Sequence, residues 1–209
     1  MDRDARNRHS CTVTLSILAS TLFCACQAQP ATEMLPGGAI APGQLEEGSF
    51  SSSSGTMSLV SESFSDGESI PAGFTCDGED ISPQIGWGQV PAEASTLVVI
   101  MDDPDAPSGT WTHWVVYNLP RDVVSLPAGA GSTPGLNGQG ETGLNSWGDQ
   151  TYGGPCPPSG THRYFFRIFA VDGPLDFSSP PTEAQVQAAM LGHILDQASL
   201  MGFYARSDS

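Results

Sequence analysis

Lysine is absent from this chain of 209 residues, and its seven basic residues are all arginines, against 23 acidic residues. The formal net charge at pH 7 is therefore −16. A surface with this charge repels phosphate backbones and anionic membranes. The composition argues against nucleic acid as a partner.

Long hydrophobic runs are also scarce, and the longest largely apolar stretch lies near the N-terminus. Residues 1–10 are polar and contain three arginines, residues 11–23 are largely apolar, and residues 24–28 are small. This order is typical of a secretory signal, and the apolar part is shorter than the roughly 18 to 20 residues of a membrane span. We expect residues 1–26 to be a signal peptide and the protein to be exported, as a periplasmic, lipid-anchored or secreted protein.

The cleavage site has two interpretations. The segment ending in Cys26 loosely resembles a bacterial lipobox, which would make Cys26 the lipidated residue, whereas residues 26–28 also suit an ordinary signal peptidase. Residues 27–56 are rich in Ala, Pro, Gly and Ser and are typical of a flexible linker. The folded domain is expected to occupy residues 57–209, with membrane contact only through the N-terminal lipid if that lipid is attached.

Cysteine is rare in the expected domain, which contains only Cys76 and Cys156 of the five in the chain. In an oxidising compartment two lone cysteines favour one disulfide, with free thiols as the alternative. Zinc is a poorer interpretation because the sequence has no CxxC or HxxxH spacing. We predict a Cys76–Cys156 disulfide and no metal site.

Four segments have the patterns of β-strands. Residues 57–64 alternate apolar and polar side chains, residues 95–101 form an apolar run, and residues 113–119 and 163–172 are rich in aromatic and β-branched side chains. Between the last two, residues 127–160 are dense in Gly, Pro, Asn and Ser. Loops of this length in a compact domain are usually functional or disordered, and we expect this one to be functional.

One helix is predicted near the C-terminus. Thr182 and Gln185 have the spacing of a capping box directly after two prolines, and Gly202 suits a C-terminal stop. Strands followed by a terminal helix, with no alternation of strands and helices, indicate a mainly antiparallel β fold. The apolar face of this helix would consist of Val186, Met190, Ile194 and Met201.

Two motifs place a histidine at the start of an apolar strand. In the first, residues 103–107 (DPDAP) lead into His113, and in the second, residues 153–160 (GGPCPPSG) lead into His162. Loops stiffened by proline and anchored on strands are a common way to build a binding site. The tryptophans beside the first histidine, Trp111 and Trp114, are expected to face away from it and to pack in the core or at the rim.

These motifs belong to a wider pattern that resembles a known family. Its motifs are FTCDGEDISP at residues 74–83, MDDPDAP at 101–107, WTHW at 111–114, YGGPCPP at 152–158 and GTHRY at 160–164. With these motifs in the family's order, residues 57–204 resemble the phosphatidylethanolamine-binding proteins, in particular their bacterial and archaeal Raf-kinase-inhibitor-like branch. The resemblance implies a Greek-key β-sandwich with a C-terminal helix near a small anion-binding pocket.

The resemblance also implies which residues line the pocket. Histidine and tyrosine offer N–H and O–H donors, and an aspartate can fix which histidine nitrogen carries the proton. Protonation of either histidine would strengthen anion binding at acidic pH. The implied ligand-binding residues are Asp103, His113, His162 and Tyr164, with Gly154 and Pro155 in the adjacent wall.

The favoured function is that of a non-enzymatic binding protein for a small anion with a phosphate or carboxylate group, for example a phospholipid head group, without a cofactor. The alternative is a protease- or kinase-inhibitor-like protein that acts on an unidentified protein partner through surface loops. A hydrolase with Ser159 as nucleophile is less favoured, because Ser159 does not lie in a G-x-S-x-G turn. Arg163 is expected to pair with Asp103 or Asp105 and so to hold two loops together.

Overall fold

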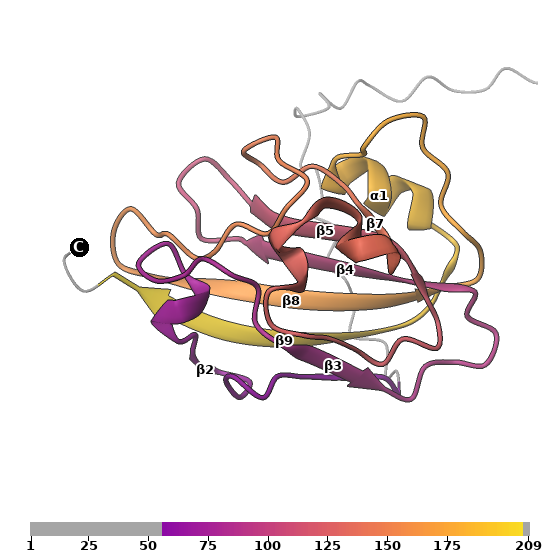
Figure 1. The fold of residues 1–209 in the computed structure, drawn as a ribbon, viewed down its shortest axis with the longest axis horizontal. Coiled ribbons are helices and arrows are strands. Elements are labelled where there is room, and N and C mark those ends of the chain that lie inside the picture. Colours follow the sequence, from indigo (N-terminus) through magenta and orange to yellow (C-terminus); the bar gives the residue numbers. More distant parts are fainter. Residues whose placement is uncertain (1–55, 207–209) are drawn as a thin grey trace, which may run out of the picture. The chain divides into compact units, whose positions relative to one another are not determined.

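The chain folds into two β-sheets that pack against each other, as a computed structural model of residues 56–206 shows (Figure 1). The expected signal peptide, Cys26 and nearly all of the expected linker lie outside the described residues. The small sheet has the order β1-β3-β6, with β1 at Ser58–Val60, β3 at Ile85–Gly88 and β6 at Ser125–Leu126. The large sheet has the order β2-β9-β8-β4-β5-β7, with β2 at Glu68–Ser69, β4 at Thr96–Asp103, β5 at Trp111–Pro120, β7 at Glu141–Thr142, β8 at Thr161–Val171 and β9 at Ile194–Ala205.

The large sheet contains a Greek key. Strands β4, β5 and β7 pair antiparallel in sequence order, and β8 then returns to the free edge of β4. The spatial order β8-β4-β5-β7 therefore places the fourth strand beside the first. One pairing departs from the antiparallel pattern, because the short β2 runs parallel to β9. The expected mainly β sandwich is confirmed.

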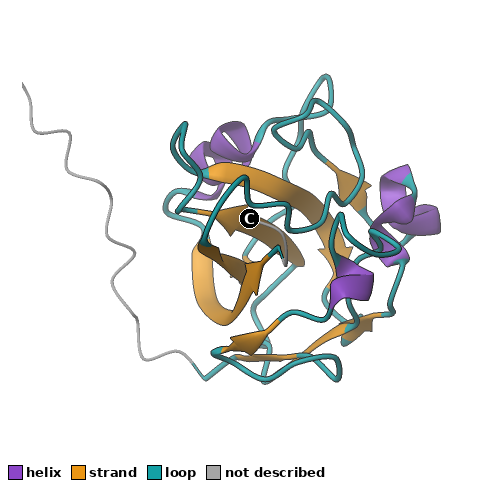
Figure 2. Ribbon diagram, turned by 90° about the vertical axis from the view of Figure 1, so that its left-hand side faces the viewer, coloured by secondary structure: helices purple, strands orange, loops and turns teal. Residues whose placement is uncertain are grey.

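Strand β4 lies between two hydrophobic clusters. Leu97, Val99 and Met101 pack toward the small sheet, and Val98 and Ile100 pack toward α1. Successive side chains of a strand point to opposite faces, so a strand covered on both faces needs a continuous apolar run. This explains the apolar segment in the sequence. In Figure 1, α1 lies on one side of the large sheet and β3 on the other, and Figure 2 shows the strands at the centre with the helices at the periphery.

The predicted C-terminal helix is present but much shorter than expected. Helix α1 spans Glu183–Met190 and begins with the predicted capping box between Thr182 and Gln185. Its continuation to residue 201 is wrong, because Gly192 adopts a left-handed φ of 81° and the chain then enters β9. Strand β9 pairs with β8 from Thr161↔Ala205 to Val171↔Ile194. These pairings along the whole length of β8 outweigh the helical spacing of Ile194 and Met201.

The other strand predictions differ from the structure mainly at their ends. The segment 57–64 forms only the three residues of β1, although Phe64 still packs in the core, 5.9 Å from the Phe166 ring centroid. The long segment 127–160 contains β7 and two short 3-10 helices, η2 at Ala130–Ser132 and η3 at Pro134–Gly138. A third, η1 at Ala72–Phe74, precedes the Cys76 loop.

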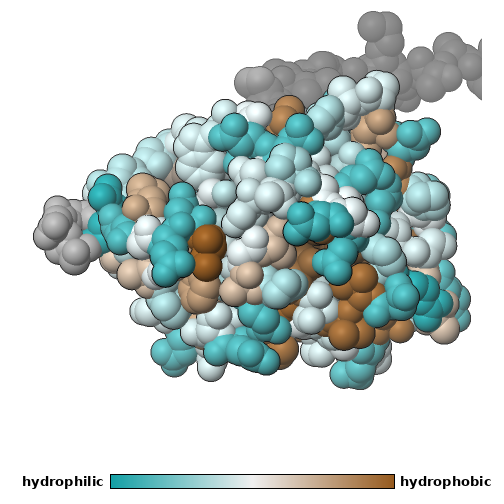
Figure 3. Space-filling model, viewed as in Figure 1, coloured by the Kyte–Doolittle hydropathy of each residue, from teal (hydrophilic) through white to brown (hydrophobic). Residues whose placement is uncertain are grey.

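Few large hydrophobic side chains are exposed among the described residues. The face seen in Figure 3 ranges from white to teal over most of its area, with hydrophobic residues gathered in a few patches. Among the described residues, none of the helices has the length and apolar character needed to cross a membrane.

Candidate functional site

The candidate site lies where three neighbouring strands of the large sheet meet their loops. Asp103 is the last residue of β4, His113 lies near the start of β5, and His162 and Tyr164 lie near the start of β8. Strand β4 is between the other two, and its Asp103 pairs with Trp111. The Greek-key return of β8 is therefore what brings both motifs to one end of the sheet.

Asp103 and His162 form a buried pair. The Nδ1–H of His162 donates to Oδ2 of Asp103 over 2.7 Å, and the two residues are 7% and 3% exposed. A carboxylate oxygen beside Nδ1 keeps the proton on that nitrogen. Nε2 of neutral His162 is therefore an acceptor, which becomes a donor when the ring is protonated.

His113 is fixed in the same tautomer by a backbone group. Its Nδ1–H donates to the carbonyl oxygen of Gly153 over 2.7 Å, and the Gly153 amide donates back to the His113 carbonyl over 3.1 Å. Burial lowers the pKa of His113, although the Gly153 carbonyl and the Asp103 charge partly counteract this effect. His113 is thus neutral at pH 7, with its Nδ1 position already occupied.

Tyr164 lies between the two histidines. Its ring centroid is 5.3 Å from that of His113, nearly at right angles, and 6.5 Å from that of His162, at 23°. Burial, together with the nearby Asp103 charge, raises the pKa of Tyr164 far above its usual value. The hydroxyl therefore stays protonated. It is buried, and the groups it interacts with are the Asp103 carboxylate and the Cys156 backbone amide.

The Gly-Pro wall is held against the loop that follows η1. The Gly154 amide donates to Oδ1 of Asp80 over 2.7 Å, and the Pro155 carbonyl accepts from the Cys76 amide over 3.2 Å. Cys76 and Cys156 form the predicted disulfide, with the sulfurs 2.11 Å apart. The 74–80 loop and the 153–156 loop are therefore joined by both hydrogen bonds and a covalent link.

Comparison with known proteins identifies the family. The family model described as phosphatidylethanolamine-binding protein matches residues 60–205. The chain belongs to the phosphatidylethanolamine-binding protein family. A relative from Methanothermobacter thermautotrophicus, named "UPF0098 protein", is 47% identical over 72% of this chain and 99% of its own length. A protein of the same name from Aquifex aeolicus is 46% identical over 75% of this chain and 93% of its own length.

Two solved structures of the phosphatidylethanolamine-binding protein family share the fold. A family homolog from Chlamydia trachomatis superposes with a TM-score of 0.66 at 41% identity, covering 72% of this chain and 98% of that one. Escherichia coli YbcL, described as a member of the mammalian family, gives a TM-score of 0.67 at 28% identity, covering 72% of this chain and 99% of its own.

Within this family fold, one side-chain expectation was wrong. Trp111 does not face away from His113, because both rings contact Trp147, with centroid distances of 5.4 and 5.2 Å. Residues two apart on a strand share a face, so Trp111 and His113 belong together. Trp114 does pack in the core, 5.8 Å from the Tyr152 ring centroid.

The partner of Arg163 is Asp105. The Arg163 guanidinium donates to both carboxylate oxygens of Asp105, over 2.6 and 2.8 Å, and its backbone amide adds a third bond over 3.0 Å. The Arg163 guanidinium lowers the pKa of Asp105 to about 2. Arg163 therefore joins the 103–107 loop to the start of β8 through Asp105, and its partner is not Asp103.

Sequence reasoning missed three contributors to this family site. The Gly153 carbonyl is a backbone group and has no side-chain signal, whereas Asp80 lies inside a quoted motif and was readable as a contact for the Gly-Pro wall. Trp147 lies in the 127–160 loop and contacts His113. The sequence predicts that this loop is functional but does not identify Trp147. Residues 56–206 contain no cluster of three or more His, Cys, Asp or Glu side chains suited to a metal ion.

Proposed function

We propose that the protein binds a small anion carrying a phosphate or carboxylate group, through Asp103, His113, His162 and Tyr164 beside the Gly154-Pro155 wall, and that it does not turn the ligand over. One observation carries the proposal. Both histidines have Nδ1 engaged by protein acceptors, which leaves the two Nε2 atoms for a ligand, and the buried Tyr164 ring lies beside both of them. Membership of the phosphatidylethanolamine-binding protein family supports a binding role.

The tautomers decide how an anion is bound. Neutral imidazoles with Nδ1–H engaged present Nε2 as an acceptor, which pairs with a P–OH or a COOH group but repels a bare anionic oxygen. A protonated imidazole presents a charged N–H donor, which forms the stronger bond. Anion binding is therefore coupled to proton uptake, and the Asp103 carboxylate fixes the orientation of the His162 ring.

The structure gives less support to a hydrolase function. Ser159 is exposed and makes no side-chain hydrogen bond to the described residues, so no histidine activates it as a nucleophile. An inhibitor role has no supporting contact and becomes the next hypothesis only if ligand binding fails. The disulfide supports a site of action outside the cytoplasm.

The test is calorimetric titration with inorganic phosphate, acetate and phosphoethanolamine. The variant His162→Gln should weaken binding at least tenfold, since a charge-assisted hydrogen bond contributes about 1.5 to 3 kcal/mol. His193→Gln is the matched control, because His193 also pairs with an aspartate, Asp172, over 2.8 Å but is exposed. Equal affinity of wild type and His162→Gln, or no binding at millimolar concentration, would refute the proposal.

A further inference from the structure

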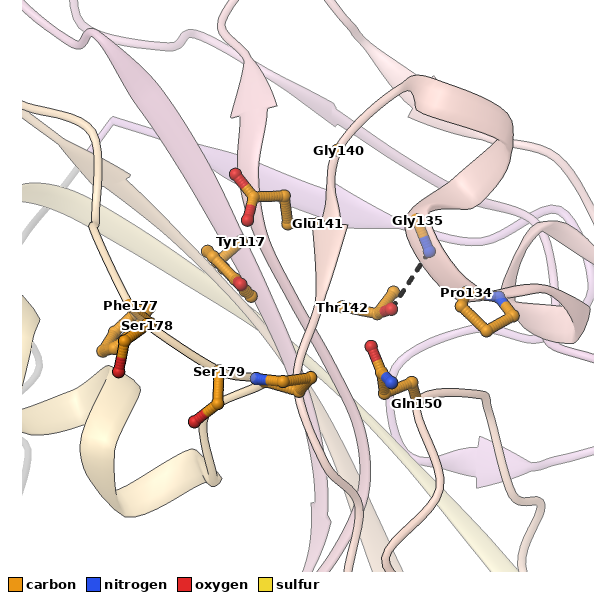
Figure 4. Close-up of a pocket in the computed structure, with 11 residues that line it drawn as sticks. Tyr117, Pro134, Gly135, Gly140, Glu141, Thr142, Gln150, Phe177, Ser178 and Ser179 are labelled. Atoms are coloured by element: carbon orange, nitrogen blue, oxygen red, sulfur yellow. Dashed lines mark hydrogen bonds between the residues drawn. The ribbon is translucent and has the colours of Figure 1, made fainter.

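A hollow lies on the large sheet and shares no lining residue with the proposed anion site. It has a volume of about 400 Å³, within the range of small-molecule sites. Its walls come from β5, the η3 segment, β7, the loop that contains Gln150 and the loop before α1, and Figure 4 shows their side chains around it. We call it the Glu141 pocket, after the residue that sets its charge; Tyr117, Thr142, Gln150, Phe177 and Ser178 also line it.

The charge of the Glu141 pocket is negative. Glu141 is the one charged side chain among its lining residues, which include no arginine or histidine. Burial and the Glu141 carboxylate raise the pKa of Tyr117 to about 12, so its hydroxyl stays neutral. The net charge of the chain adds to the same sign. The pocket therefore attracts cations and repels anions. This preference is the opposite of that of the proposed anion site.

Hydrogen-bonding groups in the pocket are available to a ligand. Oε1 of Glu141 accepts from Nδ2 of Asn118 over 2.9 Å, and the carboxylate also interacts with the Tyr117 hydroxyl. An ionised carboxylate has about four lone-pair sites, so it can accept a further donor. The side chains of Gln150, Ser178 and Ser179 make no hydrogen bond within the described part of the chain. The pocket thus offers a carboxylate oxygen, an amide oxygen and hydroxyl oxygens as acceptors.

An aromatic corner forms another part of the wall. The rings of Tyr117 and Phe177 meet at 88° with centroids 5.3 Å apart, and Phe177 is only partly buried. Aromatic faces attract ammonium groups electrostatically, and their apolar area suits the alkyl part of an amine.

The rim opposite the aromatic corner is conformationally strained. Gly135, Leu136 and Asn137 have φ values of 69°, 47° and 57°, and Leu136 is 2% exposed. Left-handed backbone at non-glycine residues is costly and persists where the surrounding structure enforces it, which happens mostly at functional sites. The Gly135 amide donates to Oγ1 of Thr142 over 3.0 Å, drawn as the dashed line in Figure 4. The rim is therefore fixed before any ligand arrives.

We propose that the Glu141 pocket binds an organic ammonium ion, the protonated amine of a small molecule or of a lysine side chain. The ammonium N–H groups donate to the Glu141 carboxylate and to the Gln150 amide oxygen, and the carbon chain lies against Phe177. This site is independent of the proposed anion site and goes beyond it, since it takes the opposite charge on a separate surface.

The experiment uses two amine probes, n-butylamine and an acetylated, amidated Gly-Lys-Gly peptide, with n-butanol as the uncharged analogue. Wild type should bind an amine saturably in the millimolar range and should not bind n-butanol. Glu141→Gln should weaken amine binding at least tenfold. Glu93→Gln is the control, because Glu93 is an exposed carboxylate outside the pocket whose removal changes the net charge equally.

The outcomes are distinct. Binding of either probe that only Glu141→Gln weakens supports the pocket, and the tighter probe identifies the source of the ammonium. No saturable binding of either probe overturns the proposal, as does an equal loss in Glu141→Gln and Glu93→Gln, which would show attraction to the acidic surface alone. A phosphate titration of Glu141→Gln should match that of wild type, so failure of the anion site is recognised separately.

Discussion

The Oδ2 atom of Asp103, at the end of β4, accepts the Nδ1 proton of His162, at the start of β8, over 2.7 Å. The two residues are 59 positions apart in the chain and are brought together by the antiparallel β4–β8 pairing. A negative side chain is thereby placed in a site that we assign to anions. Its effect is to orient and polarise the histidine, so that the proton on Nε2, once gained, faces the ligand.

Replacing Asp103 by Asn tests this role. The amide keeps the size of the side chain but replaces the charge-assisted hydrogen bond that orients His162 with a neutral one, so phosphate affinity should fall about tenfold, the difference between the two kinds of bond. Titration calorimetry at pH 6 measures the change. Asp172→Asn, which alters the exposed pair with His193, should leave affinity unchanged. Unaltered binding in Asp103→Asn would remove Asp103 from the site.

Acidification should destabilise the free protein through His113. Its folded-state pKa lies below the ordinary value of 6.5, so the unfolded chain binds more protons as the pH falls below about 6.5, and stability is lost until the folded pKa is passed. Urea unfolding at pH 7.5 and pH 5.5 measures this loss, which should be smaller in His113→Gln. Burial raises the pKa values of Asp102 and Glu183, and these two groups favour the folded state as the pH falls, which opposes the effect of His113. The decisive quantity is therefore the difference between wild type and His113→Gln in the loss of unfolding free energy.

Saturating phosphate should counteract that loss, since the proposed ligand favours charged histidines and stabilises the folded state by mass action. The same unfolding series with phosphate added would show a shallower pH dependence. Parallel curves with and without phosphate would contradict the coupling of anion binding to proton uptake.

Reduction of the disulfide should weaken both the fold and the anion site. Cys76 and Cys156 are exposed and close a loop of 80 residues, so their link contributes roughly 4 kcal/mol by the loop-entropy relation. We expect a lower melting temperature in a dithiol reductant, and a loss of phosphate affinity because the Pro155 wall is anchored beside Cys76. The double variant Cys76→Ser/Cys156→Ser should show the same deficits and no response to the reductant. Full affinity in that variant would show that the wall holds without the link.

Gly154→Ala should disrupt the wall sterically. A Cβ at this position would lie 2.5 Å from Oδ1 of Asp80 and 2.6 Å from the Phe74 carbonyl oxygen. Contacts of this kind force the backbone to move and typically cost 1 to 3 kcal/mol, here with a loss of anion binding. Gly173→Ala is the control, because a Cβ there has no neighbour within 4 Å. Thermal unfolding and phosphate titration of the two variants should therefore diverge, and similar behaviour would mean that the loop adapts.

The features that were predictable from the sequence are local ones. The capping box of Thr182 and Gln185 and the continuous apolar run of β4 depend on neighbours in the chain, and both are present. The C-terminal strand was not predictable in this way, because Val186, Met190 and Ile194 have helical spacing and only pairing with β8 selects the strand. The left-handed Gly192 was the available signal that the helix ends early.

In the candidate site, too, some features could be predicted from the sequence and others could not. The resemblance pointed to Asp103, His113, His162 and Tyr164, and the structure places all four at one end of the large sheet. The sequence does not decide whether Asp103 or Asp105 pairs with Arg163, because this depends on the geometry of the loops. In the structure Asp103 binds His162 and Asp105 binds Arg163. The Glu141 pocket could not be predicted from the sequence, because its walls come from five separate segments with no shared motif.

The pairing of β9 along the whole length of β8 has a consequence for truncated chains. A chain cut before Ile194 lacks β9, so the strand that carries His162 and Tyr164 would have one bare edge. Unpaired strand edges recruit other chains. We therefore expect such a chain to self-associate rather than to remain a monomer that binds anions more weakly.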